Sequence, residues 1–287
     1  MRLGALEAGG TKMVCAIGNA NGEIYERISI PTETPEITVP KMIEYFKEKD
    51  IQALGIGCFG PIDLNRKSET YGYITTTPKL AWKNYNIVGA FADALDIPVG
   101  FDTDVNGSAL GEATWGITKG LDNSIYITVG MGIISNGKLL HGMLHPEGGH
   151  VLLTRHPKDT YDGKCPYHSN CLEGLAAGPA IEARWGKKGI ELADKKEVWE
   201  LEAYYIGQAL VDCIMLLSPQ RIVLGGGVMH QEHMMPLVRE EVKKQLNGYL
   251  VTKELEDLDS YIVLPSLNDN QGIMGALKLA VDELAMQ

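Results

Sequence analysis

Short apolar runs separated by glycine-rich turns dominate the pattern of hydrophobic and polar positions along the chain. The runs Leu3–Glu7 and Met13–Gly18 enclose the turn Ala8–Lys12, and a third run, Glu23–Ile30, follows the turn Asn19–Gly22. Runs of about four to eight residues bounded by such turns predict strands joined in hairpins. We therefore expect the chain to open with three antiparallel strands.

Helical and strand patterns then alternate, and the whole arrangement is repeated once. A second strand run, Ser124–Val129, is followed by the glycine turn Gly130–Gly132 and by a hairpin around Asn136–Gly137. Two successive units that each open on a glycine turn predict a duplicated α/β fold. We expect domains at 1–116 and 117–287, with the closing helix able to pack back on the first. The other predicted elements are helices at Thr38–Lys49, Ala176–Trp185, Glu197–Leu217, Met234–Leu246 and Gly272–Met286, and strands at Ile51–Cys58, Ile97–Phe101, Arg221–Val228 and Tyr261–Pro265.

Composition narrows the classes of function. The 287 residues carry a formal net charge of −11, which argues against binding the phosphate backbone of a nucleic acid. No apolar run approaches the roughly 20 residues that cross a membrane, and the first residues do not resemble a signal peptide. Cys15, Cys58 and Cys213 lie among apolar neighbours, where buried thiols are expected. A cytoplasmic protein fits these features.

The first glycine turn, Gly9-Gly10-Thr11-Lys12, is open to two interpretations. It lacks the spacing of a P-loop or a Rossmann turn, and both of those motifs precede a helix, whereas this turn lies between two strands. Glycines in such a turn let backbone N–H groups converge on an anion. A tight hairpin without a ligand explains the same residues equally well.

Two later strand ends carry residues that could meet a substrate. The strand ending at Cys58 runs into Phe59-Gly60-Pro61, where glycine lets the backbone approach a ligand closely. The strand ending at Phe101 runs into Asp102-Thr103-Asp104 just before a helix. In an open α/β sheet, such a carboxylate is well placed to contact substrate, although Asp104 could also simply cap the helix.

The stretch from Pro146 to Glu173 contains a candidate metal site. Cys165, His168 and Cys171 follow the pattern C-x2-H-x2-C, and His150 or His156 could supply a fourth ligand. Two thiolates and two imidazoles match the tetrahedral preference of zinc. The alternative is a loop without metal. Glu147, close to His150, adds a carboxylate that suits hydroxyl-rich ligands.

Taken together, EAGGTK, GIGCFGPID, TDVNGSALGE, PEGGH, the Cys/His cluster and LGGGV resemble the ROK family of sugar kinases, in the same order along the chain. His168 in place of a cysteine is similar to the fructokinase branch. The resemblance implies an actin-like, RNase H-like ATPase fold with two domains around a cleft, usually dimeric. It also implies an ATP:D-fructose 6-phosphotransferase that converts fructose to fructose 6-phosphate, with ATP, Mg²⁺ and Zn²⁺ as cofactors.

The resemblance also assigns roles to individual residues. It makes Asp104 the general base and zinc a brace that orients His150, which places His150 ahead of His156 as a ligand. The residues implied in binding ATP are Gly9, Gly10, Thr11, Lys12, Thr128, Gly130, Gly132, Gly225, Gly226 and Gly227. Those implied in binding the sugar are Gly60, Pro61, Thr103, Asp104, Glu147 and His150. Those implied in binding zinc are His150, Cys165, His168 and Cys171.

Three positions depart from the family pattern. Glu7 replaces an Asp and should still reach Mg²⁺ or its water, and Thr103 replaces an Asn beside the catalytic Asp. The second glycine loop is several residues short, either because the loop is truly shortened or because a stretch is missing from the sequence. Two alternatives therefore remain: a kinase for glucose or mannose, and a non-catalytic sugar-binding regulator. The family's repressors carry a helix-turn-helix before the first glycine turn, and eight residues before Gly9 leave no room for it.

Overall fold

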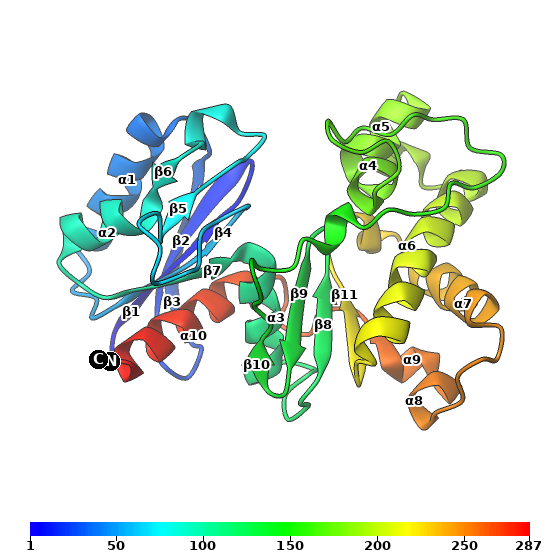
Figure 1. The fold of residues 1–287 in the computed structure, drawn as a ribbon. Coiled ribbons are helices and arrows are strands. Elements are labelled where there is room, and N and C mark those ends of the chain that lie inside the picture. Colours follow the sequence, from blue (N-terminus) through cyan, green and yellow to red (C-terminus); the bar gives the residue numbers. More distant parts are fainter. The chain divides into compact units, whose positions relative to one another are not determined.

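The computed structural model describes residues 1–287, which form two compact units. Unit 1 comprises Met1–Gly120, Lys138–His145 and Pro265–Gln287, and unit 2 comprises Leu121–Gly137 and Pro146–Leu264. The last helix of the chain therefore lies in unit 1, together with the first strands (Figure 1).

The sheet of unit 1 has the order β3-β2-β1-β4-β7. Strands β1, β2 and β3 are antiparallel neighbours, whereas β4 and β7 run parallel to β1. The three predicted opening strands are thus confirmed. The strands are β1 (Leu3–Ala8), β2 (Lys12–Gly18), β3 (Ile24–Pro31), β4 (Leu54–Cys58) and β7 (Val99–Thr103).

Helices cover both faces of this sheet. On one face, side chains such as Leu6 and Ile56 pack with Phe46 of α1 and Phe91 of α2. On the other face, Leu3 and Ala5 pack with α10. Burial on both faces explains why β1 reads as a continuous apolar run. The helices are α1 (Pro35–Lys47), α2 (Ile87–Leu95), α3 (Asp104–Trp115) and α10 (Gln271–Ala285), and a small ladder is made by β5 (Tyr73–Ile74) and β6 (Tyr85–Asn86).

The second sheet repeats the first. Its order is β10-β9-β8-β11-β12, with β9 antiparallel to β8 and with β11 and β12 parallel to it. The same arrangement, an antiparallel meander followed by two parallel strands, confirms the predicted duplication. The strands are β8 (Ser124–Ile127), β9 (Met131–Ser135), β10 (Lys138–Leu139), β11 (Arg221–Leu224) and β12 (Ile262–Val263). The helices of unit 2 are α4 (Leu172–Ala176), α5 (Gly178–Trp185), α6 (Lys196–Leu217), α7 (Met234–Leu246), α8 (Lys253–Glu256) and α9 (Leu258–Tyr261).

Most predicted helices agree with the structure within a few residues, whereas α2, α8 and α9 are not predicted and one predicted helix is divided in two. Helix α2, which Asn86 caps by accepting a hydrogen bond from Gly89 N at 2.7 Å, is not predicted by the hydrophobic pattern. The predicted helix Ala176–Trp185 is two helices, α4 and α5, separated at Ala177, whose backbone is extended.

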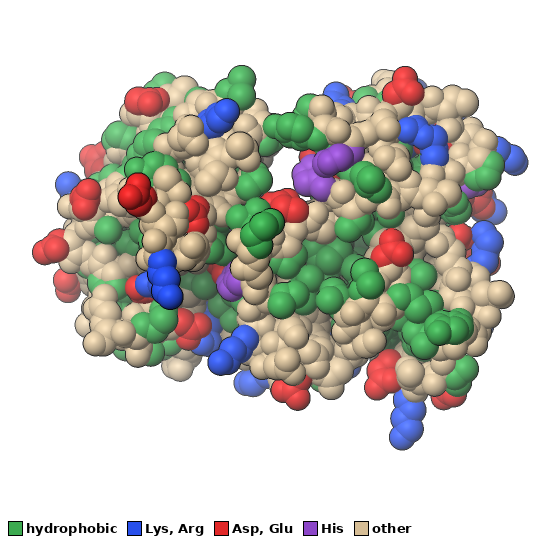
Figure 2. All heavy atoms as spheres, in the orientation of Figure 1, with side chains coloured by type: hydrophobic (Ala, Val, Ile, Leu, Met, Phe, Trp, Pro, Cys, Tyr) green, Lys and Arg blue, Asp and Glu red, His purple; other side chains and the backbone are tan.

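Acidic and basic side chains are dispersed over the face seen in Figure 2. None of the helices is both long enough and apolar enough to pass through a bilayer.

Glycines let α10 approach the sheet of unit 1 at backbone distance. A side-chain carbon added to Gly55 of β4 would lie 1.7 Å from Ala276 O, and one added to Gly100 of β7 would lie 2.2 Å from Leu279 O. On the flank of α10, one added to Gly275 would lie 1.7 Å from Gly107 O of α3. The contact between α10, α3 and the sheet is therefore backbone against backbone, which leaves no space for a methyl group.

Gly55→Ala should lower the free energy of unfolding by about 3 kcal/mol, because the added carbon must displace either α10 or β4. Chemical denaturation measures the change. Gly178→Ala, at the first residue of α5 with nothing within 4 Å, is the matched control and should change stability little. Equal stability of the two variants would contradict the backbone contact between α10 and β4.

Candidate functional site

The parallel strands β1, β4 and β7 end at one edge of the first sheet. Phe59 N, just after β4, donates to Ala8 O at the end of β1 at 2.9 Å. The first glycine turn leaves β1 at the same edge and is closed by a hydrogen bond from Gly9 N to Lys12 O at 3.1 Å. A side-chain carbon on Gly9 would lie 2.7 Å from that oxygen, so the turn requires glycine there.

Asp104 is the first residue of α3 but does not cap it. The cap is Thr103, whose Oγ1 accepts a hydrogen bond from Asn106 N at 3.1 Å. The Asp104 carboxylate accepts from the N–H of its neighbour Val105 at 2.9 Å and from no side chain. The structural role that could have explained Asp104 thus belongs to Thr103, which leaves the carboxylate of Asp104 available for chemistry.

Glu7 and Asp104 form a pair of carboxylates at this edge. Burial raises the pKa of Asp104 above its ordinary value. Burial and then the neighbouring Asp104 raise the pKa of Glu7 from 4.5 to about 7. The first turn of α10 encloses Glu7, since a side-chain carbon on Gly272 would lie 2.7 Å from the carboxyl carbon of Glu7. Two buried carboxylates, one of which raises the pKa of the other in this way, favour a bound cation or a shared proton.

Asp102 and His141 form a further pair that the sequence analysis missed. The buried Asp102 carboxylate accepts from Thr103 N at 2.8 Å and from Asn106 Nδ2 at 2.7 Å, and His141 Nε2 lies 2.8 Å away. Hydrogen bonding to Asp102 raises the pKa of His141. Asp102 thereby orders the backbone that carries Asp104. Its position two residues before Asp104 is the only signal in the sequence.

The Gly60–Pro61 segment is held by its neighbours in unit 1. Thr75 donates to Pro61 O through its N–H at 2.9 Å and its hydroxyl at 3.0 Å. Ile62 N donates to Nε2 of the buried His145 at 3.1 Å. These bonds fix a backbone segment that starts where β4 ends.

The second glycine turn is a three-residue connection between β8 and β9. Thr128 N donates to Gly130 O at 3.0 Å, whereas Gly132 lies inside β9 opposite Tyr126. The turn offers few N–H groups to an anion because it is so short.

Gly225–Gly227 lie beside that turn. Gly225 N donates to Ile127 O at 2.7 Å, and Gly226 has a φ of 87°, which favours glycine. Gly225–Gly227 line a pocket of about 390 Å³ together with Thr128 and Val129 of the turn. Its other walls are mostly apolar and include Ile181, Ile190, Trp199 and Leu210.

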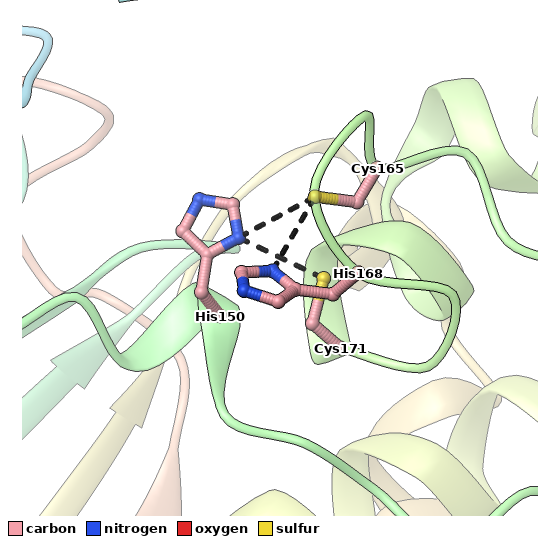
Figure 3. A group of neighbouring side chains, drawn as sticks. All are labelled: His150, Cys165, His168 and Cys171. Carbon is pink, nitrogen blue, oxygen red and sulfur yellow. Dashed lines mark hydrogen bonds between the residues drawn. The ribbon is translucent and has the colours of Figure 1, made fainter. Parts of the chain in front are cut away.

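Four side chains of unit 2 form the predicted Cys/His cluster (Figure 3). Cys165 Sγ lies 3.8 Å from His150 Nδ1 and 3.6 Å from His168 Nδ1, and Cys171 Sγ lies 3.7 Å from His150 Nδ1. Tetrahedral zinc with bonds of about 2.3 Å to sulfur and 2.0 Å to nitrogen places such ligands about 3.6 Å apart. The donor set and its spacing therefore fit zinc.

His156 is not part of the cluster. Its ring packs edge-on against Tyr204 at 4.8 Å, and its backbone N–H donates to Tyr205 OH at 3.1 Å. The structure thus brings His150, the first of the two alternatives, to the cysteines.

A carboxylate that the sequence analysis did not single out lies beside His150. Glu173 Oε2 is 3.6 Å from His150 Nε2, the ring nitrogen that does not face the sulfurs. This separation is too long for a direct hydrogen bond and leaves both groups able to contact a ligand hydroxyl. Glu147 precedes the short 3-10 helix Gly148–His150, and its carbonyl accepts from His150 N at 2.9 Å. Glu173 could have been noticed because it lies two residues after Cys171.

A buried polar network anchors the loop that leads to the cluster. Arg184 of α5 donates to Glu202 of α6 and to Asp159 of the loop, each at 3.1 Å. Tyr205 OH donates to the same Asp159 at 2.6 Å. Burial raises the pKa of Glu202 to about 8. The loop is therefore tied to both helices a few residues before Cys165.

Cys171→Ser should abolish stoichiometric zinc binding, because it removes one thiolate from a four-ligand set. His150→Ala should do the same, whereas His156→Ala should keep one equivalent of metal. Elemental analysis of the dialysed proteins measures this. Cys213→Ser, at a buried thiol outside the cluster, is the control. Full zinc content in Cys171→Ser would show that the cluster is not a zinc site.

Glu7→Gln should stabilise the protein at pH 8 by about 3 kcal/mol in magnesium-free buffer. A carboxyl whose pKa is raised on folding binds its proton more tightly in the folded state. Its contribution to stability is therefore present near pH 4.5 and is lost as pH rises through about 7. Denaturation at pH 4.5 and pH 8 measures the difference, with the exposed Glu69→Gln as control. A difference that does not change with pH would contradict an enclosed Glu7.

Known proteins resemble this chain along its full length. Residues 3–283 match the ROK family. A protein of Bacillus subtilis (strain 168) is 53% identical over 283 residues, which cover 97% of this chain and 95% of the relative. The fructokinase of Pediococcus pentosaceus is 46% identical, with 98% of both chains covered.

A solved structure confirms the predicted fold. The ROK hexokinase from Thermus thermophilus superimposes with a TM-score of 0.79 over 100% of both chains, at 23% identity. The duplicated sheets, the order of the motifs and the full-length matches lead to one conclusion: the chain belongs to the ROK family.

Proposed function

We propose that this protein is an ATP-dependent fructokinase that makes fructose 6-phosphate, with Asp104 as its general base. The observation that carries the proposal is the position of Asp104. This residue begins α3 at the edge where the parallel strands end, and its carboxylate is free for chemistry because Thr103 caps the helix. Relatives named fructokinase at 43–46% identity over more than nine-tenths of this chain support the choice of sugar.

The nucleotide would be held by glycine segments and an apolar pocket. The pocket beside Gly225–Gly227 suits an adenosine group, because its walls are mainly aliphatic and aromatic. The first turn would bind phosphate oxygens through the backbone N–H groups of Gly9–Lys12, the Thr11 hydroxyl and the Lys12 ammonium. Thr128, Gly130 and Gly132 are the corresponding candidates of the second turn.

The chemistry requires few groups. The 6-hydroxyl oxygen of fructose attacks the γ-phosphorus of ATP, the bond from that phosphorus to the β–γ bridging oxygen breaks, and ADP leaves. Asp104 accepts the proton that the hydroxyl loses. A raised pKa makes the carboxylate a better acceptor, because general catalysis is most efficient when the pKa lies nearer the working pH.

Two metals have residues that suit them. Glu7 offers the oxygen ligands that Mg²⁺ prefers, directly or through a water, and Mg²⁺ would supply charge neutralisation at the phosphates. His150, Cys165, His168 and Cys171 would hold Zn²⁺. In that arrangement His150 uses Nδ1 toward the cysteines and keeps Nε2 for the ligand side.

We assign sugar binding to groups that can hydrogen-bond hydroxyls, following the family resemblance. The assigned residues are Gly60, Pro61, Thr103, Asp104, Glu147 and His150. We also propose a homodimer as the assembly, following the family resemblance.

The short turn between β8 and β9 favours one alternative, a sugar-binding protein without turnover. A coupled assay with fructose, glucose and mannose decides between a fructokinase and a sugar-binding protein without turnover. We expect fructose to give the highest kcat/KM, and we expect Asp104→Asn to lower kcat by about 10²–10⁴-fold while fructose still binds. Fructose binding by calorimetry with no turnover on any hexose would instead establish the non-catalytic alternative.

A further inference from the structure

Lys79 is a cation whose ammonium group is not paired with a carboxylate in a chain of net charge −11. Its backbone is held by two hydrogen bonds: Lys79 N donates to Thr77 Oγ1 at 3.2 Å, and Lys79 O accepts from Trp82 N at 2.8 Å at the start of the 3-10 helix Leu80–Trp82. Trp82 anchors that helix, because its ring is buried and its Nε1 donates to Glu33 O at 2.8 Å. The side chain of Lys79 therefore extends from a well-fixed backbone.

The side chain of Lys79 extends over Phe59 toward the first glycine turn. Its Nζ lies 5.8 Å from the centroid of the Phe59 ring, which itself packs edge-on against Trp82. A side-chain carbon on Gly10 would lie 2.8 Å from Lys79 Cε and 3.3 Å from Lys79 Nζ. The ammonium group thus rests against Gly10, where only a hydrogen atom leaves space for it.

The Lys79 ammonium group therefore lies at the edge of unit 1 where the parallel strands end and where Asp104 is located. Gly10 follows β1, Phe59 follows β4 and Asp104 follows β7, and these three strands are parallel neighbours. The carboxylates of Glu7 and Asp104 lie at the same edge and repel an incoming phosphate. A fixed ammonium group beside the turn offsets that repulsion at the point where phosphate oxygens would meet backbone N–H groups.

We propose that Lys79 binds the phosphoryl group that is transferred from ATP, holding it against the Gly9–Gly10 turn. The proposal rests on the proposed kinase function and adds a residue that contacts the reacting group. Gly10 has a part in it, because a side chain there would push the ammonium away from the turn.

Kinetics of Lys79→Met provide the first test. We expect kcat to fall about 100-fold, as for removal of one preorganised donor, while the KM for fructose changes less than about twofold. Lys83→Met is the matched control, since Lys83 is an exposed lysine at the other end of the same 3-10 helix, and it should keep full activity. A raised KM for fructose with unchanged kcat would overturn the proposal, because it would place Lys79 on the sugar.

Comparing the binding of an ATP analogue with that of ADP tests whether Lys79 contacts the γ-phosphate, and this comparison does not require turnover. By calorimetry, Lys79→Met should weaken the non-hydrolysable β–γ imido analogue of ATP about tenfold while leaving ADP almost unchanged. Equal weakening of both nucleotides, or of neither, would overturn the assignment. If the wild-type protein phosphorylates no sugar, the proposed function fails, yet this comparison still reports on Lys79.

Gly10→Ala provides an independent route to the same contact. The added methyl group should displace the flexible lysine, so Gly10→Ala and the double variant Gly10→Ala/Lys79→Met should lower kcat to a similar extent. Fully additive losses would show that Gly10 and Lys79 act separately and would contradict the proposal. Thermal unfolding confirms that each variant is folded.

Discussion

The backbone contact between α10 and the first sheet is the constraint on which the rest of unit 1 depends. Gly55, Gly100 and Gly275 allow a helix from the end of the chain to lie directly on strands from its beginning. That approach brings Gly272 against Glu7 and removes the carboxylate from water. The raised pKa of Glu7, and the negative edge that Lys79 faces, are consequences of this packing rather than of local sequence.

Much of this arrangement is visible in the sequence. The two meanders could be predicted because strands of this length alternate with glycine turns, and the turn chemistry excludes both familiar nucleotide-binding loops. The Cys/His cluster could be predicted because three ligands lie within seven residues of the chain, from Cys165 to Cys171. Features of this kind depend on residues that are close together in the sequence, so the sequence alone is enough to predict them.

Other features depend on contacts between distant parts of the chain. The choice between His150 and His156 depends on where a short 3-10 helix points, and no spacing rule contains that information. His141 reaches Asp102 across 39 positions, and Lys79 meets Gly10 from a loop that reads only as polar with one aromatic. The sequence does not distinguish a catalytic Asp104 from a helix cap, and only the structure shows that Thr103 caps α3.

The Cys/His cluster joins His150 to Cys171, which are 21 positions apart. A bound metal there closes a loop, so it acts as a removable cross-link that stabilises the folded segment, because the unfolded chain does not hold the four ligands together. Because the cross-link forms by mass action, the rigidity of this segment follows the concentration of free metal. A loop that carries Glu173 and His150 would then loosen when zinc is scarce, and zinc supply would become a control on sugar affinity that needs no separate effector site.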